Sequence, residues 1–117
     1  MSTEPGNQST GLPPANSAPT TLGELLAAVA AGDQAAFERL YVATRANLFG
    51  VVIRILRRRE LAEAVTQEAY LKIWRSAGQY KPTLASPLTW MVTIARNRAI
   101  DEVRRGNATD AEADFTD

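Results

Sequence analysis

Apolar residues recur at three- and four-residue steps along most of this chain, and this helical spacing constrains its fold more than any other feature. The step is clearest in residues 34–57, where Phe37, Leu40, Tyr41, Leu48 and Val52 follow it. No stretch shows the sustained alternation of apolar and polar residues that is typical of a strand. The sequence therefore predicts an all-α fold, a compact bundle of about four helices.

Capping residues indicate where these helices begin and end. Thr21 with Glu24 three positions later forms a capping box, and Gly32 is a typical C-terminal stop. Asp33 can cap the second helix. Ser86 can cap the last helix, with Pro87 as its first residue. Helices are expected over about residues 21–31, 33–57, 60–76 and 86–105.

The chain is predicted to hold one domain between two tails. At 117 residues it suits a single core, which residues 21–106 would form. Residues 1–20 are rich in Pro, Ser, Thr and Gly with almost nothing to bury, and residues 107–117 carry four acidic side chains. Both tails are expected to be disordered.

Composition excludes several classes of function. There is no Cys and no His, which removes a disulfide framework, a thiolate nucleophile and the commonest transition-metal ligands. The acidic residues are scattered, so no carboxylate pair for catalysis is visible. We therefore expect a protein that is not an enzyme and that binds neither a metal ion nor a cofactor. The absence of an apolar run of roughly 20 residues and of a signal peptide favours a cytoplasmic location.

The folded part is more basic than the whole chain. Net charge is zero, with 13 basic and 13 acidic residues. All 13 basic residues lie between Arg39 and Arg105, whereas residues 22–106 hold only eight of the acids, which leaves this part at +5. A basic body suits a polyanionic partner, although an ordinary soluble domain can carry such a charge.

The last predicted helix has two contrasting faces. Its apolar face is expected to build the core: Leu88, Met91, Val92, Ala95, Ala99 and Val103. The opposite side carries Trp90, Ile94, Asn97, Asp101 and Arg104. Packing against another helix would explain an aromatic and an aliphatic residue there. An aromatic platform, an amide and nearby arginines would equally suit unstacked nucleic acid.

Two further segments leave alternatives open. The outer side of the third helix mixes apolar and charged residues, which is typical of a docking surface for another helix but also of a solvated face. The run from Ile53 to Arg59 ends the second helix in basic residues. These cations either stabilise the helix dipole or contact phosphates.

Three blocks in order resemble a known family. ELAEAVTQEAYLKIW, the Tyr80-Lys81-Pro82 loop and SPLTWMVTIARNRAIDEVRR are similar to domain 2 of bacterial RNA polymerase sigma factors of the extracytoplasmic-function (ECF) group. The resemblance spans about residues 22–106, and TWMVTIARNRAID is its most specific part.

The resemblance implies a sigma factor in transcription initiation that docks on the β′ clamp helices of RNA polymerase and melts the promoter −10 element. Its third helix would contact the polymerase through Leu61, Gln67, Glu68, Leu71 and Lys72. A flipped base of the single-stranded non-template strand would be captured by Tyr80, Lys81, Ser86, Trp90 and Asn97. Backbone phosphates would be bound by Arg98, Arg104 and Arg105.

The chain departs from the family pattern at several points. Ala64 stands where the family usually has an Asp, which removes an expected salt bridge to the clamp, and Thr66 replaces an aliphatic residue. Similar proteins also carry a second domain that reads the −35 element, so we interpret the chain as a fragment in which residues 107–117 begin the acidic interdomain linker.

The same resemblance also suggests a protein partner and an alternative function. Sigma factors of this group are commonly held by anti-sigma factors, and such a partner is expected here. The alternative function is a sigma-like mimic that sequesters an anti-sigma factor and never touches a promoter. A helix-turn-helix reader of duplex DNA fits poorly, because the last helix follows a loop of about ten residues rather than a tight turn.

Overall fold

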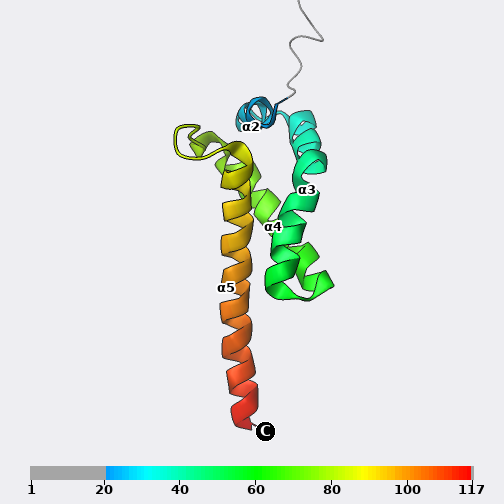
Figure 1. Cartoon of the computed structure of the whole chain (residues 1–117), viewed down its shortest axis with the longest axis vertical. Helices are drawn as coiled ribbons and strands as arrows, with labels where there is room; N and C mark the ends of the chain where they lie inside the picture. Colours follow the sequence, from blue (N-terminus) through cyan, green and yellow to red (C-terminus); the bar gives the residue numbers. More distant parts are fainter. Residues whose placement is uncertain (1–20, 117) are drawn as a thin grey trace, which may run out of the picture.

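The computed structural model describes residues 21–116, with side chains described for residues 21–106. Helices account for the regular structure in this part of the chain, and it contains no strand, so the all-α prediction is confirmed. The predicted disorder of residues 1–20 lies outside the described residues. The elements, shown in Figure 1, are α2 (Leu22–Ala30), α3 (Gln34–Leu56), α4 (Arg59–Ser76), the 3₁₀ helix η1 (Ala77–Gln79) and α5 (Pro87–Thr116).

The predicted capping residues make their hydrogen bonds at the starts of α2 and α3. The Thr21 hydroxyl accepts a hydrogen bond from the Glu24 backbone N–H, and the Glu24 carboxylate accepts one from the Thr21 N–H, both at 3.1 Å. The Asp33 carboxylate accepts from the Ala36 N–H at 3.1 Å. Gly32 separates the two helices with a φ of 92°, a left-handed conformation that costs glycine little. Local side-chain chemistry therefore fixes this corner.

The corner between α3 and α4 lies one residue earlier than the sequence predicts. α3 ends at Leu56, and Arg57 caps it in a left-handed conformation with a φ of 63°. The side chains of Arg57 and Arg54 donate to the carbonyls of Arg54 and Gly50, at 2.9 and 3.1 Å. Part of the basic run thus serves the end of the helix, as the helix-dipole interpretation predicts.

α5 begins where the sequence predicts. The Ser86 hydroxyl accepts from the Thr89 N–H at 3.2 Å, and the Trp90 N–H donates to the Ser86 carbonyl at 2.9 Å. The helix runs on to Thr116, beyond Gly106, where the folded body was predicted to end.

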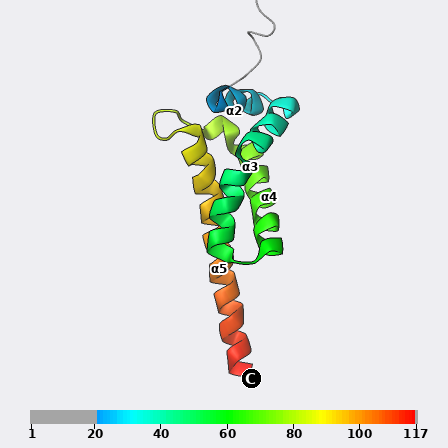
Figure 2. The ribbon, with the colours of Figure 1, turned by 45° about the vertical axis from the view of Figure 1, so that its right-hand side comes forward.

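Three helices, α3, α4 and α5, pack along one another, and α2 crosses one end of the group (Figures 1 and 2). Each contributes fully buried side chains to one core: Leu26, Leu40, Leu48, Val52, Val65, Ile73 and Met91. The predicted apolar face of α5 lies in this core through Met91, Ala95 and Ala99, which are completely buried. No helix in the described residues is long and apolar enough to cross a membrane.

Buried polar groups in this core are satisfied. The Thr44 hydroxyl donates to the Leu40 carbonyl at 2.8 Å and can therefore accept from the Tyr70 hydroxyl. Burial raises the pKa of Tyr70 above its ordinary value, and the hydrogen bond with Thr44 opposes this shift. Thr66 donates to the Ala62 carbonyl at 2.7 Å, which explains how a threonine is tolerated at this buried position.

Candidate functional site

The loop before α5 is closed by its own hydrogen bonds. The Tyr80 hydroxyl donates to the Ala85 carbonyl at 2.6 Å, and the Leu84 N–H donates to the Lys81 carbonyl at 3.0 Å. Leu84 is 79% exposed, and Lys81 is exposed and makes no ion pair within the described residues. The loop is thus a fixed turn that presents a cation and an apolar side chain to solvent.

Tyr80 and Trp90 form an aromatic pair beneath this loop. Their ring centroids lie 5.4 Å apart and the rings are tilted by 59°. Both side chains are half-buried, and Trp90 and Ile94 pack against the core cluster. Packing inside the domain therefore accounts for part of the second face of α5, and only the remaining surface of the pair is open to a ligand.

Asn97 places an exposed amide on the same side of α5. It lies two turns beyond Trp90, on the helix face that also holds Ile94. Its amide makes no hydrogen bond with the side chains that the structure describes. Ser86, by contrast, uses its hydroxyl in the helix cap, where it also donates to the Thr89 hydroxyl at 2.9 Å. Asn97 therefore has its full hydrogen-bonding capacity available, whereas the Ser86 hydroxyl does not.

The predicted phosphate-binding arginines are surrounded by carboxylates. Arg98 contacts Glu68 of α4 through Nε at 2.6 Å and Glu102 through Nη2 at 3.0 Å. Burial lowers the pKa of Arg98, but the hydrogen bonds with Glu102 and Glu68 outweigh it and raise the pKa above its ordinary value. Arg105 shares Glu102 at 3.2 Å. The guanidinium of Arg98 is therefore committed to ion pairs in this state.

These arginines border a shallow hollow on α5. It has a volume of about 500 Å³ and is lined by Arg98, Asp101, Arg104 and Arg105. Arg104 lies 3.8 Å from Asp101, a contact between exposed groups. Exposed pairs of this kind exchange readily with solvent and with other ions.

The predicted docking residues share the outer surface of α4. Gln67, Glu68, Leu71 and Lys72 are exposed, and Leu61 is half-buried against the core. Leu71 is 53% exposed, a large fraction for a leucine on a helix. An apolar side chain among an amide and charged groups matches the composition of a protein-binding surface.

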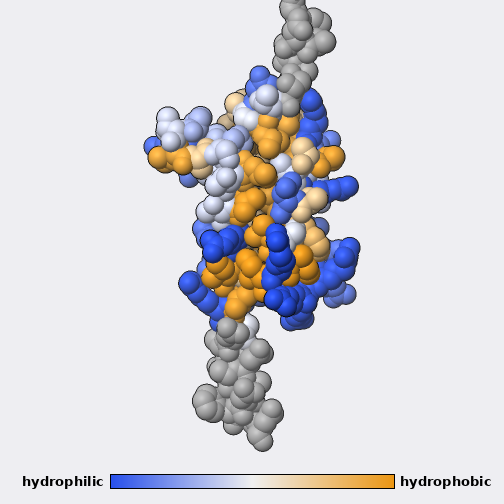
Figure 3. Space-filling view, viewed as in Figure 1, coloured by the Kyte–Doolittle hydropathy of each residue, from blue (hydrophilic) through white to orange (hydrophobic). Residues whose placement is uncertain are grey.

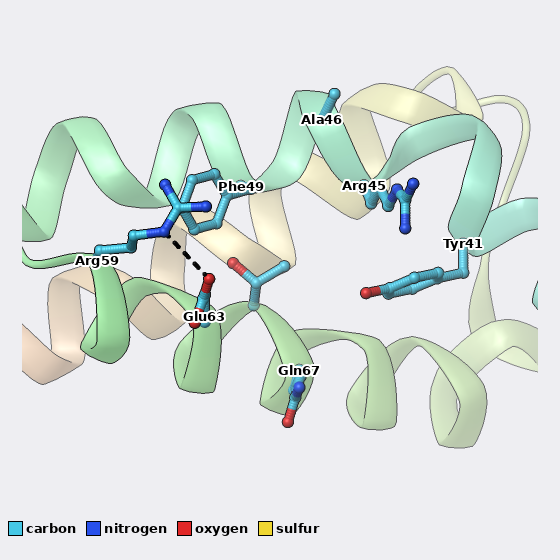
Figure 4. A pocket seen from close by; sticks show the side chains of 8 residues that line it. Tyr41, Arg45, Ala46, Phe49, Arg59, Glu63 and Gln67 are labelled. Atoms are coloured by element: carbon cyan, nitrogen blue, oxygen red, sulfur yellow. Dashed lines mark ion pairs between the residues drawn. The ribbon is translucent and has the colours of Figure 1, made fainter.

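A groove between α3 and α4 adds residues that the sequence analysis missed. Figure 4 shows Tyr41, Arg45 and Phe49 of α3 on one side and Arg59 and Glu63 of α4 on the other side of a hollow of about 430 Å³. Gln67, a predicted docking residue, also lines this hollow. Arg59 lies 3.4 Å from Glu63 and sits over the Phe49 ring, 5.6 Å from its centroid. The spacing of Tyr41, Arg45 and Phe49, one every four residues, was the signal that could have revealed this face.

Hydrophilic side chains gather near the α3–α4 corner. Figure 3 shows them bordering apolar surface at this end of the bundle. Arg54, Arg57 and Arg58 are exposed here. Among the described residues, no group of three or more acidic residues could hold a metal ion.

Comparison with known protein families identifies the family of this chain. The family model for sigma-70 region 2 matches residues 40–109, from within α3 to within α5, so this chain belongs to the sigma-70 region 2 family. The matched segment includes both the outer surface of α4 and the loop and arginines of α5.

The curated relatives are named as ECF sigma factors. The chain is 46% identical over 89 residues to the ECF RNA polymerase sigma factor SigK of Mycobacterium sp. (strain KMS), a match covering 76% of this chain and 46% of the relative. It is 42% identical over 87 residues to SigK of Mycolicibacterium vanbaalenii, covering 74% and 44%. For SigK of Mycobacterium tuberculosis (strain ATCC 25177 / H37Ra) the identity is 43% over 83 residues, covering 71% and 44%. The chain thus spans about half the length of these relatives.

Proposed function

We propose that this chain is the part of an ECF sigma factor that binds core RNA polymerase and opens the promoter −10 element during transcription initiation. The observation that carries the proposal is the sigma-70 region 2 match over residues 40–109, because that segment contains both exposed faces described above. The similarity to relatives named ECF RNA polymerase sigma factors supports the same assignment.

The outer surface of α4 is proposed to dock on the β′ clamp helices. Leu71 supplies apolar contact area, and Leu61, Gln67, Glu68 and Lys72 surround it. Polar groups around an exposed apolar centre give both contact area and orientation. With Ala64 in place of the family's Asp, the carboxylates on this surface are Glu63 and Glu68.

The loop and α5 are proposed to capture a flipped non-template base. Tyr80 and Trp90 offer an aromatic surface on which an unstacked base can stack. The Asn97 amide can make paired hydrogen bonds to a base edge, with Lys81 in the loop and Ser86 at the end of the loop nearby. Arg98, Arg104 and Arg105 would hold backbone phosphates without reading sequence.

Strand capture is a binding mechanism, in which no covalent bond changes. A protein that binds an extruded base more tightly than a stacked one offsets the few kcal/mol that unstacking costs. The closed loop keeps the capturing groups in place before DNA arrives, which limits the ordering cost of binding. An anti-sigma factor that covers the same faces would block both steps.

Fluorescence anisotropy tests this function. The chain is titrated against a pool of single-stranded −10-like oligonucleotides, at low and moderate salt, with and without a fragment bearing the clamp helices. Asn97→Ala is compared with Asn47→Ala, which removes an exposed amide from α3 on a different surface.

We expect sequence-selective binding that the clamp fragment strengthens and that Asn97→Ala weakens by about fivefold or more, since a paired amide contact is worth about 1–3 kcal/mol. Asn47→Ala should leave it unchanged. Binding without sequence preference, indifferent to Asn97→Ala, would refute base capture and favour the sigma-like mimic.

A further inference from the structure

Glu68 takes part in both proposed faces at once. It lies on the outer surface of α4 between Gln67 and Leu71, and its side chain is 50% exposed. The same carboxylate reaches across to α5, where its Oε1 lies 2.6 Å from Nε of Arg98. A single carboxylate therefore links the surface proposed to dock on polymerase with the arginines proposed to bind DNA.

The arginine hollow is electrically balanced in this state. Arg98, Arg104 and Arg105 are matched by Glu68, Asp101 and Glu102. A phosphate entering beside Arg98 would meet a guanidinium that already has a carboxylate on two of its nitrogens. Such a site attracts a polyanion only weakly until one of these carboxylates leaves.

Glu68 is the carboxylate best placed to leave. Glu102 lies on α5 itself, is only 16% exposed and contacts both Arg98 and Arg105, so it remains with its partners when α4 is engaged. Glu68 comes from another helix, and within the described residues its exposed side chain forms an ion pair with Arg98 alone. A cationic side chain from a partner on α4 would compete directly for it.

We propose that the Glu68–Arg98 pair couples docking on α4 to phosphate binding on α5, an inference that rests on the proposed function of both faces. In the undocked chain Glu68 occupies Arg98 and weakens DNA binding. A docked partner that takes up the Glu68 carboxylate releases Arg98 for a phosphate. Because coupling between two sites is reciprocal, bound DNA strengthens docking by the same factor.

The test measures binding of a labelled oligo(dT) strand and of a −10-like strand to the full chain without any polymerase fragment. Glu68→Gln removes the competing charge and keeps the shape of the side chain. Glu63→Gln is the matched control, because it makes the same charge change on the same helix at a residue that pairs with Arg59 instead. Both substitutions are repeated with Arg98→Gln, and thermal unfolding checks that every variant folds.

We expect Glu68→Gln to tighten binding of both strands by about two- to fivefold, the range that an exposed ion pair supports. Glu63→Gln should change it less, and with Arg98→Gln the two substitutions should have equal effects. The coupling is overturned if Glu68→Gln and Glu63→Gln have equal effects in the chain that keeps Arg98. It is also overturned if neither the unsubstituted chain nor the Glu68→Gln variant binds DNA. The proposed function fails separately, if the unsubstituted chain shows no preference for the −10-like strand over oligo(dT).

A readout without DNA distinguishes coupling from a general charge effect. Hydrogen exchange of the Arg98 Nε–H, followed by NMR, should be slow in the free chain because this proton is donated to Glu68. Adding the clamp-helix fragment should speed the exchange if docking withdraws Glu68. Unchanged exchange in a chain that binds the fragment would contradict the release step.

Discussion

Tyr80→Phe removes one hydroxyl from the candidate DNA-binding loop and leaves the aromatic ring in place. That hydroxyl donates to the Ala85 carbonyl at 2.6 Å and closes the loop over the start of α5. The ring keeps its contact with Trp90, 5.4 Å between centroids, so stacking surface is unchanged. The substitution therefore separates loop positioning from base stacking.

The expected magnitude follows from this single hydrogen bond. A typical intramolecular hydrogen bond contributes about 0.5–1.5 kcal/mol, and this one is only partly buried. We therefore expect a loss of about 1 kcal/mol. For a domain of this size that corresponds to a Tm lower by about 4–8 °C. If only the closed loop binds DNA, affinity should fall by up to about fivefold.

Thermal unfolding and anisotropy with a −10-like single strand measure the two effects. Tyr41→Phe is the matched control, because the Tyr41 hydroxyl makes no hydrogen bond within the described residues and its ring lies on the α3 side. If Tyr80→Phe changes neither stability nor affinity, or if Tyr41→Phe changes both as much, the loop-closing role of this hydroxyl is refuted.

Three further predictions concern the core and one helix end. Burial raises the pKa of Tyr70 above the ordinary value of 10.0, so the unfolded chain ionises first and stability should fall as pH rises through and above that value, by at most about 1.4 kcal/mol per pH unit. Urea unfolding of the wild-type chain and of Tyr70→Phe should show this alkaline loss only in the wild type; parallel curves would contradict it. Met91→Ala, at a fully buried position, should cost about 2–5 kcal/mol by the same method, and a loss below about 1 kcal/mol would mean that the site collapses around the cavity. Arg57→Gly should raise stability by about 0.5–1 kcal/mol, because glycine adopts the φ of 63° without strain; a lower unfolding midpoint would show that the Arg57 side chain outweighs that strain.

Helix starts were predictable because capping is local. Thr21, Asp33 and Ser86 each bond to a backbone N–H three residues later, and the sequence alone shows that spacing. The corner at Arg57 was placed less well. The sequence around Arg57 does not indicate its left-handed backbone conformation, because that conformation is imposed by the packing of α3 against α4.

The faces of α4 and α5 were predictable as patterns, whereas their internal contacts were not. Helical periodicity correctly separated Met91 from Asn97. The tilted contact of Tyr80 with Trp90 and the pairing of Glu68 with Arg98 depend on which segments become neighbours. The sequence therefore suggested side chains that are free to bind a ligand, whereas the structure shows them already in contact with one another.

Capture of a base from an unpaired DNA strand requires that the protein prefer single-stranded DNA to duplex DNA of the same sequence. Affinities of the chain for a −10-like single strand and for the same sequence as a duplex are compared at one salt concentration, with Asn97→Ala alongside. The single strand should bind at least about tenfold more tightly than the duplex, and Asn97→Ala should remove most of this difference. Equal or tighter binding of the duplex would contradict base capture.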